Sequence, residues 1–166
     1  DAVVRYYVLQ RLERLGLWYL VMDYVDGPQL AGAMAERGPL PPEELIALAI
    51  RVADGLQAAH EQGVFHRDIA PDNILLEGGR PEGAMLIDFG IAKNTRPGAG
   101  SVIGGGFAGK YEYAAPEQFL GKAEARSDIY ALGATLLAAA RGVEPQVPYD
   151  YGEVLDLKNH PLDISD

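Results

Sequence analysis

Two apolar runs rich in valine, leucine and tyrosine open the chain, Val3–Gln10 and Leu17–Val25, and a short, mostly polar stretch separates them. Runs of this kind joined by a few polar residues are typical of a β-hairpin. Two shorter apolar runs come later, Ile74–Leu76 and Met85–Ile87, on either side of a segment rich in glycine and proline. They predict a second, smaller hairpin.

The remaining apolar pattern is helical. The longest such stretch, Pro42–Gln62, begins with acidic residues and is followed by glycine, which is how helices commonly begin and end. Its apolar residues recur at helical spacing and would form one buried stripe: Leu45, Leu48, Ala49, Val52, Leu56 and Ala59. Shorter helices are predicted at Leu30–Glu36, Pro116–Leu120 and Ser127–Ala140, the last with Ser127 as its N-cap.

The composition narrows the class of function. Of the 166 residues, 48% are apolar and 23% are charged, close to ordinary globular usage. The formal net charge of −10 disfavours a nucleic-acid binder or a polybasic membrane binder, because both need a surplus of cations. There is no cysteine and no apolar run near the roughly 20 residues of a membrane span. We therefore expect a cytoplasmic protein with no membrane span in this segment.

Three short motifs follow one another in a fixed order. His66-Arg67-Asp68 is followed, five residues after the aspartate, by Asn73; then come Asp88-Phe89-Gly90 and Ala115-Pro116-Glu117. The first two motif aspartates are 20 positions apart, and the final glutamate lies 29 positions farther on. Each motif alone is weak evidence. Together with Val21-Met22-Asp23-Tyr24 upstream, the set resembles a Ser/Thr protein kinase of the bacterial regulatory kind, over essentially the whole chain.

This resemblance implies an α+β fold of the protein kinase type. Residues 1–26 would be a remnant of the small lobe and hinge, and residues 27–166 a part of the mainly helical large lobe. The implied activity is transfer of the γ-phosphoryl group of ATP to serine or threonine hydroxyls of a protein substrate. Asp68 would orient that hydroxyl and accept its proton, and Asn73 and Asp88 would hold Mg²⁺.

The resemblance also implies a set of contacts to the adenine of ATP. Met22 would be the gatekeeper of the purine site, and Leu75 would form its floor. The backbone carbonyl of Asp23 and the N–H of Val25 would face the purine edge. Taken alone, each of these residues is ordinary strand or core material.

Other motif residues are expected to have structural or regulatory roles. His66 resembles a packing histidine bonded to the backbone, and Asp128 would tie the catalytic loop to the last predicted helix. Arg67 would pair either with a phosphorylated residue or with a nearby carboxylate. Ser101 is the first candidate for such a phosphorylation site and Thr95 the second.

Two positions depart from the family pattern. Ala70 stands two residues after Asp68, where Ser/Thr kinases usually have lysine, and Lys110 stands where threonine is expected. We predict that Lys110 replaces the missing lysine as a catalytic residue, with its ammonium within about 4 Å of the Asp68 carboxylate. The alternative is a Lys110 that points to solvent.

The family's phosphate-binding lysine is also missing, because no lysine precedes Lys93. We therefore expect the chain to be an excerpt of a longer protein and to be inactive alone. Two classes of function stay open for the parent protein. It is either an active Ser/Thr kinase, which the complete set of Asp68, Asn73 and Asp88 favours, or a pseudokinase-like module that binds a protein partner without catalysis.

Overall fold

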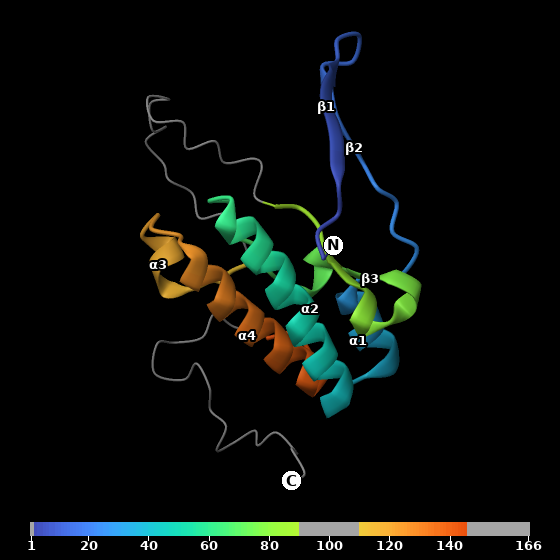
Figure 1. Cartoon of the computed structure of the whole chain (residues 1–166), viewed down its shortest axis with the longest axis vertical. Helices are drawn as coiled ribbons and strands as arrows, with labels where there is room; N and C mark the ends of the chain where they lie inside the picture. Colours follow the sequence, from blue (N-terminus) through green and yellow to red (C-terminus); the bar gives the residue numbers. More distant parts are fainter. Residues whose placement is uncertain (1, 90–109, 146–166) are drawn as a thin grey trace.

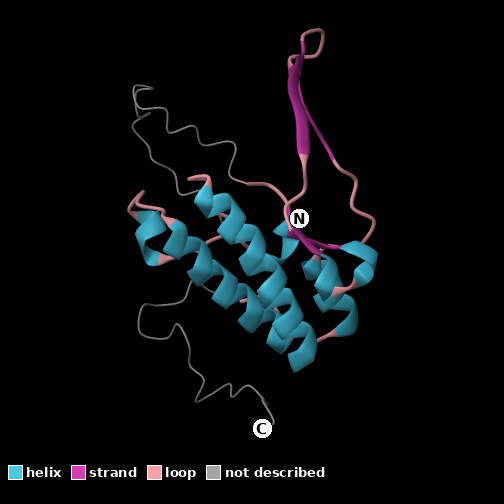
Figure 2. Cartoon of the chain, viewed as in Figure 1, coloured by secondary structure: helices cyan, strands magenta, loops and turns pink. Residues whose placement is uncertain are grey.

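The computed structural model describes residues 2–89 and 110–145 of the chain. Within these ranges helices form the body of the molecule, and one long hairpin projects from it (Figure 1). Figure 2 shows strands in this hairpin and in a second pair near its base. In the described part of the chain, no helix is both long enough and apolar enough to cross a membrane.

The projecting hairpin consists of β1 (Tyr6–Leu12) and β2 (Leu17–Met22), which are antiparallel. This confirms the first predicted hairpin, although the first expected strand is divided. Residues 2–4 instead run along the second sheet, where Val4 donates its N–H to the Leu86 carbonyl at 3.1 Å. The pairing of β1 with β2 also has an irregularity of register between Tyr6 and Val8, near the point where the chain leaves the second sheet.

The second sheet pairs β3 (Ile74–Leu76) with β4 (Ala84–Leu86), also antiparallel, which confirms the second predicted hairpin. Leu75 lies opposite Met85 in this pair. Short 3₁₀ turns precede β3 and fill the connection to β4, at Pro71–Asn73, Glu77–Gly79 and Pro81–Gly83.

The described part of the chain also contains four helices: α1 (Leu30–Arg37), α2 (Pro42–Glu61), α3 (Pro116–Phe119) and α4 (Ala125–Arg141). The two long ones, α2 and α4, pack side by side (Figure 1). The predicted stripe of α2 faces the core: Leu48, Val52 and Leu56 are buried, and its other three members are partly buried.

The segment between β2 and α1 lies directly against β3. Its backbone is bonded there, with the N–H of Leu76 donating to the Pro28 carbonyl and the N–H of Gly78 to the Asp26 carbonyl, both at 2.8 Å. A Cβ at Gly27 would lie 1.8 Å from the carbonyl oxygen of Leu76. Only glycine fits this approach, so Gly27 fixes how closely the segment docks on the sheet.

The N-terminus of α4 differs from the prediction. The helix begins at Ala125 with Glu124 as its N-cap, so the expectation that Ser127 caps it is wrong. Ser127 lies in the first turn, where its Oγ accepts the N–H of Glu124 at 3.2 Å and donates to the carboxylate of Glu117 at 2.6 Å. Its hydroxyl therefore joins α4 to α3, a contact that the local sequence pattern does not reveal.

Candidate active site

Asp128, in the first turn of α4, organises the loop that carries the first motif. Its carboxylate is fully buried and accepts the backbone N–H of His66 at 2.8 Å and that of Arg67 at 2.7 Å. A third contact comes from the ring Nε2 of His60, near the end of α2, at 2.8 Å. A buried carboxylate needs such partners, because unpaired charge is costly away from water. The predicted structural role of Asp128 is confirmed.

His66 is a packing residue, as predicted. Its Nδ1 accepts the N–H of Asp68 at 3.3 Å, so its Nε2 carries the proton and donates to the carbonyl of Ile87 at 2.8 Å. The ring packs on Phe89 with centroids 4.5 Å apart. Burial is the main cause that lowers the pKa of His66 below its ordinary value of 6.5. A neutral, fully bonded imidazole of this kind sets the position of the loop rather than exchanging protons with a substrate.

Asp68 and Asn73 form one hydrogen-bonded unit. The side-chain Nδ2 of Asn73 donates to the backbone carbonyl of Asp68 at 2.7 Å and to its carboxylate Oδ2 at 3.1 Å. This uses the nitrogen end of the amide and leaves Oδ1 of Asn73 without a hydrogen-bond donor among the described residues. Asp68 is partly exposed, so its carboxylate remains accessible to a ligand.

Lys110 approaches Asp68 through its backbone. Its N–H donates to Asp68 Oδ1 at 3.2 Å, whereas its ammonium Nζ lies 2.7 Å from Oδ1 of Asp72. The prediction that the ammonium pairs with Asp68 is therefore wrong, and so is the alternative that it points to solvent. Because the main chain of Lys110 already lies at the Asp68 carboxylate, the four-carbon side chain extends past it to the next carboxylate of the loop.

Asp88 lies two residues after the end of β4, and Asn73 lies directly before β3, the partner of that strand. The N–H of Ile87 donates to the Asn73 carbonyl at 3.1 Å, which brings the two predicted Mg²⁺ ligands to the same side of the loop. Asp88 is exposed, and its backbone is left-handed, with φ of 58°. Its N–H donates to the hydroxyl of Tyr6 at 2.7 Å. Burial is the main cause that raises the pKa of Tyr6 above its ordinary value of 10.0, so the phenol remains protonated at neutral pH.

The residues predicted to contact a purine lie together. Val25 is buried in a small apolar cluster, and Met22 and Leu75 pack against that cluster. The backbone carbonyl of Asp23 and the N–H of Val25 have no hydrogen-bond partner within residues 2–89 and 110–145. An apolar surface thus lies beside one free acceptor and one free donor.

The boundary after residue 26, between a remnant of the small lobe and a part of the large lobe, stays a prediction.

Arg67 links the loop to α3 through its backbone. Its φ is 68°, and its carbonyl accepts the side-chain Nε2 of Gln118 at 2.8 Å, while Gln118 Oε1 accepts the N–H of Ala115 at 3.0 Å. The guanidinium Nε is buried without a hydrogen bond, and no carboxylate in the described ranges lies within ion-pair distance of it. The candidate phosphorylation sites Ser101 and Thr95 lie outside the described residues.

The donor atoms at this site fit Mg²⁺ bound together with phosphate. Among the described residues, no group of three histidine, cysteine, aspartate or glutamate side chains could form a metal cage. The available oxygens are the carboxylate of Asp88 and Oδ1 of Asn73. Mg²⁺ in phosphate-handling sites is commonly held by one or two protein side chains plus substrate phosphates. The residues present therefore suit that metal.

Sequence reasoning missed three contacts of the site: His60 with Asp128, Gln118 with Arg67, and Tyr6 with Asp88. They join residues that are 68, 51 and 82 positions apart. Tyr6 lies inside the apolar run Val3–Gln10, so the sequence pattern marks it only as a strand residue. Nothing in the pattern indicates a partner for any of the three, so the contacts could not be found without the fold.

Comparison with known proteins agrees with this geometry. The protein kinase domain family matches residues 2–154. The chain is 38% identical over 135 residues to serine/threonine-protein kinase pkn2 of Myxococcus xanthus, which covers 79% of the chain and 16% of that protein. It is 38% identical over 131 residues to serine/threonine-protein kinase PknD of Mycobacterium tuberculosis, covering 78% and 19%.

Among solved structures, the kinase domain of M. tuberculosis PknI superposes with a TM-score of 0.68 at 31% identity. That match covers 89% of the chain and 52% of the PknI domain. The chain thus spans about half of this solved kinase domain and less than a fifth of the two relatives named above. By the family match and by these relatives, the chain belongs to the protein kinase family.

Proposed function

We propose that the protein carrying this chain is a serine/threonine kinase that transfers the γ-phosphoryl group of ATP to hydroxyls of protein substrates. The observation that supports this most is the bonded pair of Asp68 and Asn73, with Asp88 brought beside it by β4. Phosphoryl transfer needs mainly positioned charges at the phosphates and a group that orients the attacking hydroxyl. These three side chains supply both.

Asp68 is the group that orients the substrate hydroxyl and accepts its proton. Asn73 Nδ2 and the N–H of Lys110 each donate to one of its carboxylate oxygens. Each oxygen keeps further acceptor capacity for an incoming hydroxyl. A carboxylate fixed in this way can act without first reorganising, which is the basis of electrostatic catalysis.

Asn73 and Asp88 are the Mg²⁺ ligands in this proposal. Because the nitrogen of the Asn73 amide donates to Asp68, its oxygen is the atom available to a metal. Asp88 is exposed and makes no ion pair with the described residues. When bound, Mg²⁺ supplies charge neutralisation at the phosphate oxygens.

The purine of ATP binds between Met22, Leu75 and the hinge backbone. Met22 and Leu75 offer apolar surface, and the carbonyl of Asp23 and the N–H of Val25 offer one acceptor and one donor. A mostly apolar surface with a few placed polar groups is typical of sites for small planar ligands. A cytoplasmic location belongs to the same proposal, since a chain without cysteine suits a reducing compartment.

Lys110 provides the positive charge that Ala70 does not. Its ammonium pairs with Asp72, four positions after Asp68, and both partners of the pair are about one-third exposed. Such a pair is weak and exchangeable in water. A phosphate group arriving at Asp68 can therefore replace Asp72 as the partner of this ammonium.

A pseudokinase-like binding module is the second candidate. Ala70 favours it, because this residue lacks the cation that Ser/Thr kinases usually place two positions after Asp68. Such a module would bind a protein partner without transferring phosphate.

The experiment is phosphate transfer from radiolabelled ATP to a mixture of serine- and threonine-containing peptides. It uses the whole protein, because the 166-residue chain alone should bind ATP no better than roughly millimolar. Asp68→Asn keeps the shape of the side chain and removes the proton acceptor. We expect turnover to fall by about 10²-fold or more, with an unchanged circular dichroism spectrum.

Asp54→Asn on the exposed face of α2 is the matched control, and its turnover should equal that of the wild type. In the same assay Lys110→Thr should lower turnover by roughly 10-fold, and adding Ala70→Lys should restore part of it. Near-normal turnover in Asp68→Asn, or no phosphate transfer by the wild type, would contradict the active kinase and favour the pseudokinase-like binding module.

A further inference from the structure

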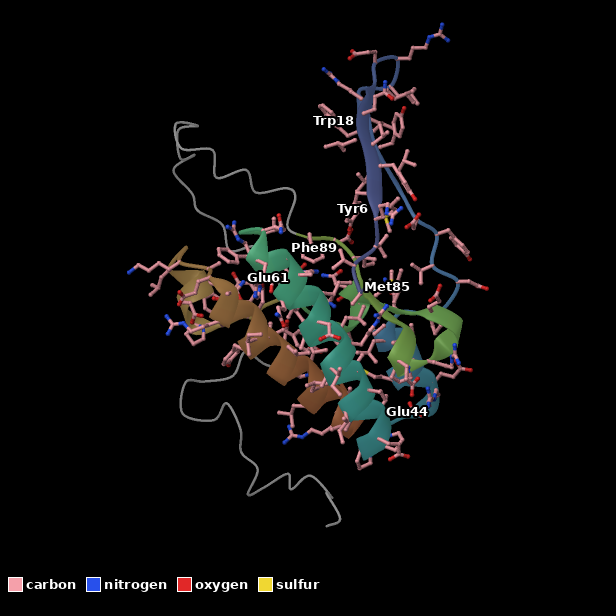
Figure 3. All side chains as sticks on the ribbon, in the orientation of Figure 1. Tyr6, Trp18, Glu44, Glu61, Met85 and Phe89 are labelled. Carbon is pink, nitrogen blue, oxygen red and sulfur yellow. The ribbon has the colours of Figure 1, made fainter. Side chains whose placement is uncertain are left out.

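Within the described residues, the hydroxyl of Tyr6 is the only hydrogen-bond partner of the Asp88 backbone. The N–H of Asp88 donates to Tyr6 Oη at 2.7 Å. Figure 3 shows Tyr6 at the base of the projecting hairpin, with Phe89 below it. The two bonded residues are 82 positions apart, so the contact joins the start of the chain to the third motif.

Asp88 needs such a contact because its backbone is in an uncommon conformation. Its φ of 58° lies in the left-handed region, which residues with a side chain adopt rarely and only when their surroundings require it. The neighbours are fixed: Ile87 is bonded at both its N–H and its carbonyl, and Phe89 packs on His66. Asp88 itself is hydrogen-bonded only to Tyr6 among the residues that the structure describes.

Tyr6 is also paired with β2. It is the first residue of β1 and pairs with Met22, the last residue of β2. A phenylalanine would fill the same space as the Tyr6 ring. The hydroxyl is therefore used for one purpose that packing does not require, which is to accept the N–H of Asp88.

We propose that Tyr6 is a positioning residue for the metal site, whose hydroxyl fixes the backbone of Asp88 and couples its carboxylate to the base of the β1–β2 hairpin. This inference rests on the proposed function in one respect, that Asp88 is a Mg²⁺ ligand. The hydrogen bond itself can be tested without any nucleotide or metal.

The first experiment measures amide hydrogen exchange by NMR on the ¹⁵N-labelled chain. Tyr6→Phe removes the acceptor and keeps the ring, so the Asp88 amide should exchange about fivefold faster, as expected for the loss of one ordinary hydrogen bond. The Ile87 amide, bonded to Asn73, should not change. Tyr19→Phe is the control, because it removes a hydroxyl on the same hairpin that donates to Gln10 at 2.6 Å. Unchanged Asp88 exchange in Tyr6→Phe would overturn the inference.

The second experiment uses the whole protein and measures ADP binding by calorimetry at a series of Mg²⁺ concentrations. Tyr6→Phe should raise the Mg²⁺ concentration for half-maximal binding about fivefold and leave the affinity for ADP without Mg²⁺ unchanged. A residue that only packs would not produce this split. Equal weakening with and without Mg²⁺ would overturn the positioning role.

Asp88→Asn separates this inference from the proposed function. It should raise the Mg²⁺ requirement more than Tyr6→Phe does. If Asp88→Asn has the Mg²⁺ dependence of the wild type, Asp88 is not a ligand, and the metal site of the proposed function fails together with the coupling inferred here. The exchange result would then still decide whether Tyr6 fixes the backbone.

Discussion

The β1–β2 hairpin and the loop that carries Asp68 differ in what they expose. The hairpin presents large apolar side chains at the surface, among them Trp18 at 65% and Leu9 at 56% exposure. The loop and its support bury polar groups, with His66 and Asp128 both at 0%. The hairpin is therefore held mainly by strand pairing, and the loop by satisfied buried hydrogen bonds. Substitutions should cost most at polar residues of the loop, the reverse of what hydrophobicity alone would suggest.

The largest effect is expected at Asp128. Asp128→Ala leaves two backbone N–H groups and the His60 ring without their acceptor, and should lower the free energy of unfolding by about 3–5 kcal/mol. Trp18→Ala removes more apolar surface, but from an exposed position, and should change it by no more than about 0.5 kcal/mol. Urea unfolding of the chain measures both.

If Asp128→Ala does not fold, Asp128→Asn provides the measurement, because its amide oxygen keeps one acceptor and its loss should be smaller. The comparison between the two regions would be reversed if Trp18→Ala proved as costly as the Asp128 variants.

A second, smaller effect on stability is expected at Gly27, where the segment between β2 and α1 lies against β3. Gly27→Ala places a methyl group 1.8 Å from the Leu76 carbonyl oxygen and should destabilise the chain by about 1–3 kcal/mol or more. Gly32→Ala is the matched control, because Gly32 lies in α1 with no atom within 4 Å of its added Cβ. This control should be stabilising by about 0.4–1 kcal/mol. Thermal unfolding of the two variants gives the contrast, and equal melting temperatures would refute close docking at Gly27.

The smallest effect is a pH dependence from His66. Burial lowers the pKa of His66 in the folded chain, so below pH 6.5 the unfolded chain takes up a proton that the folded chain resists. Stability should therefore fall as the pH drops from 6.5 toward the lowered pKa, by at most about 1.4 kcal/mol per pH unit. Above 6.5 this residue should add no slope.

Urea unfolding from about pH 5.5 to about pH 7.5 tests this, with His66→Gln as the comparison, whose slope should be shallower. The same slope in both proteins would mean that other groups cause the pH dependence. Trp18 carries no titratable group, so Trp18→Ala should leave this pH dependence unchanged.

The elements of the fold were predictable from the sequence because their signals are local. The helical stripe of α2 and the paired apolar runs of both hairpins depend on spacing within a few residues, and all were confirmed. The start of α4 was predicted wrongly. Serine is a common N-cap residue, but the hydroxyl of Ser127 instead donates to Glu117, which lies in another helix. Local patterns decide which element forms, and tertiary contacts decide where it begins.

For the candidate site, the sequence proposes the members, which stay predictions, and does not reveal how they are bonded to one another. Order and spacing of the motifs support the resemblance to kinases, and that resemblance proposes Asp68, Asn73 and Asp88 as well as Met22, Val25 and Leu75. The partner of the Lys110 ammonium was predicted wrongly, since the chain meets Asp68 through a backbone N–H and this shifts the reach of the side chain by one carboxylate. The fold, and not the charge of the side chain, decides whether a residue meets a site through its backbone or through its side chain.

The backbone of Arg67 connects two helices. Its N–H is bonded to Asp128 of α4, and its carbonyl is bonded to Gln118 of α3. Rotation about φ or ψ of Arg67, the residue before Asp68, would break one of these two hydrogen bonds. We therefore expect a displacement of either α3 or α4 to be transmitted to the backbone next to Asp68.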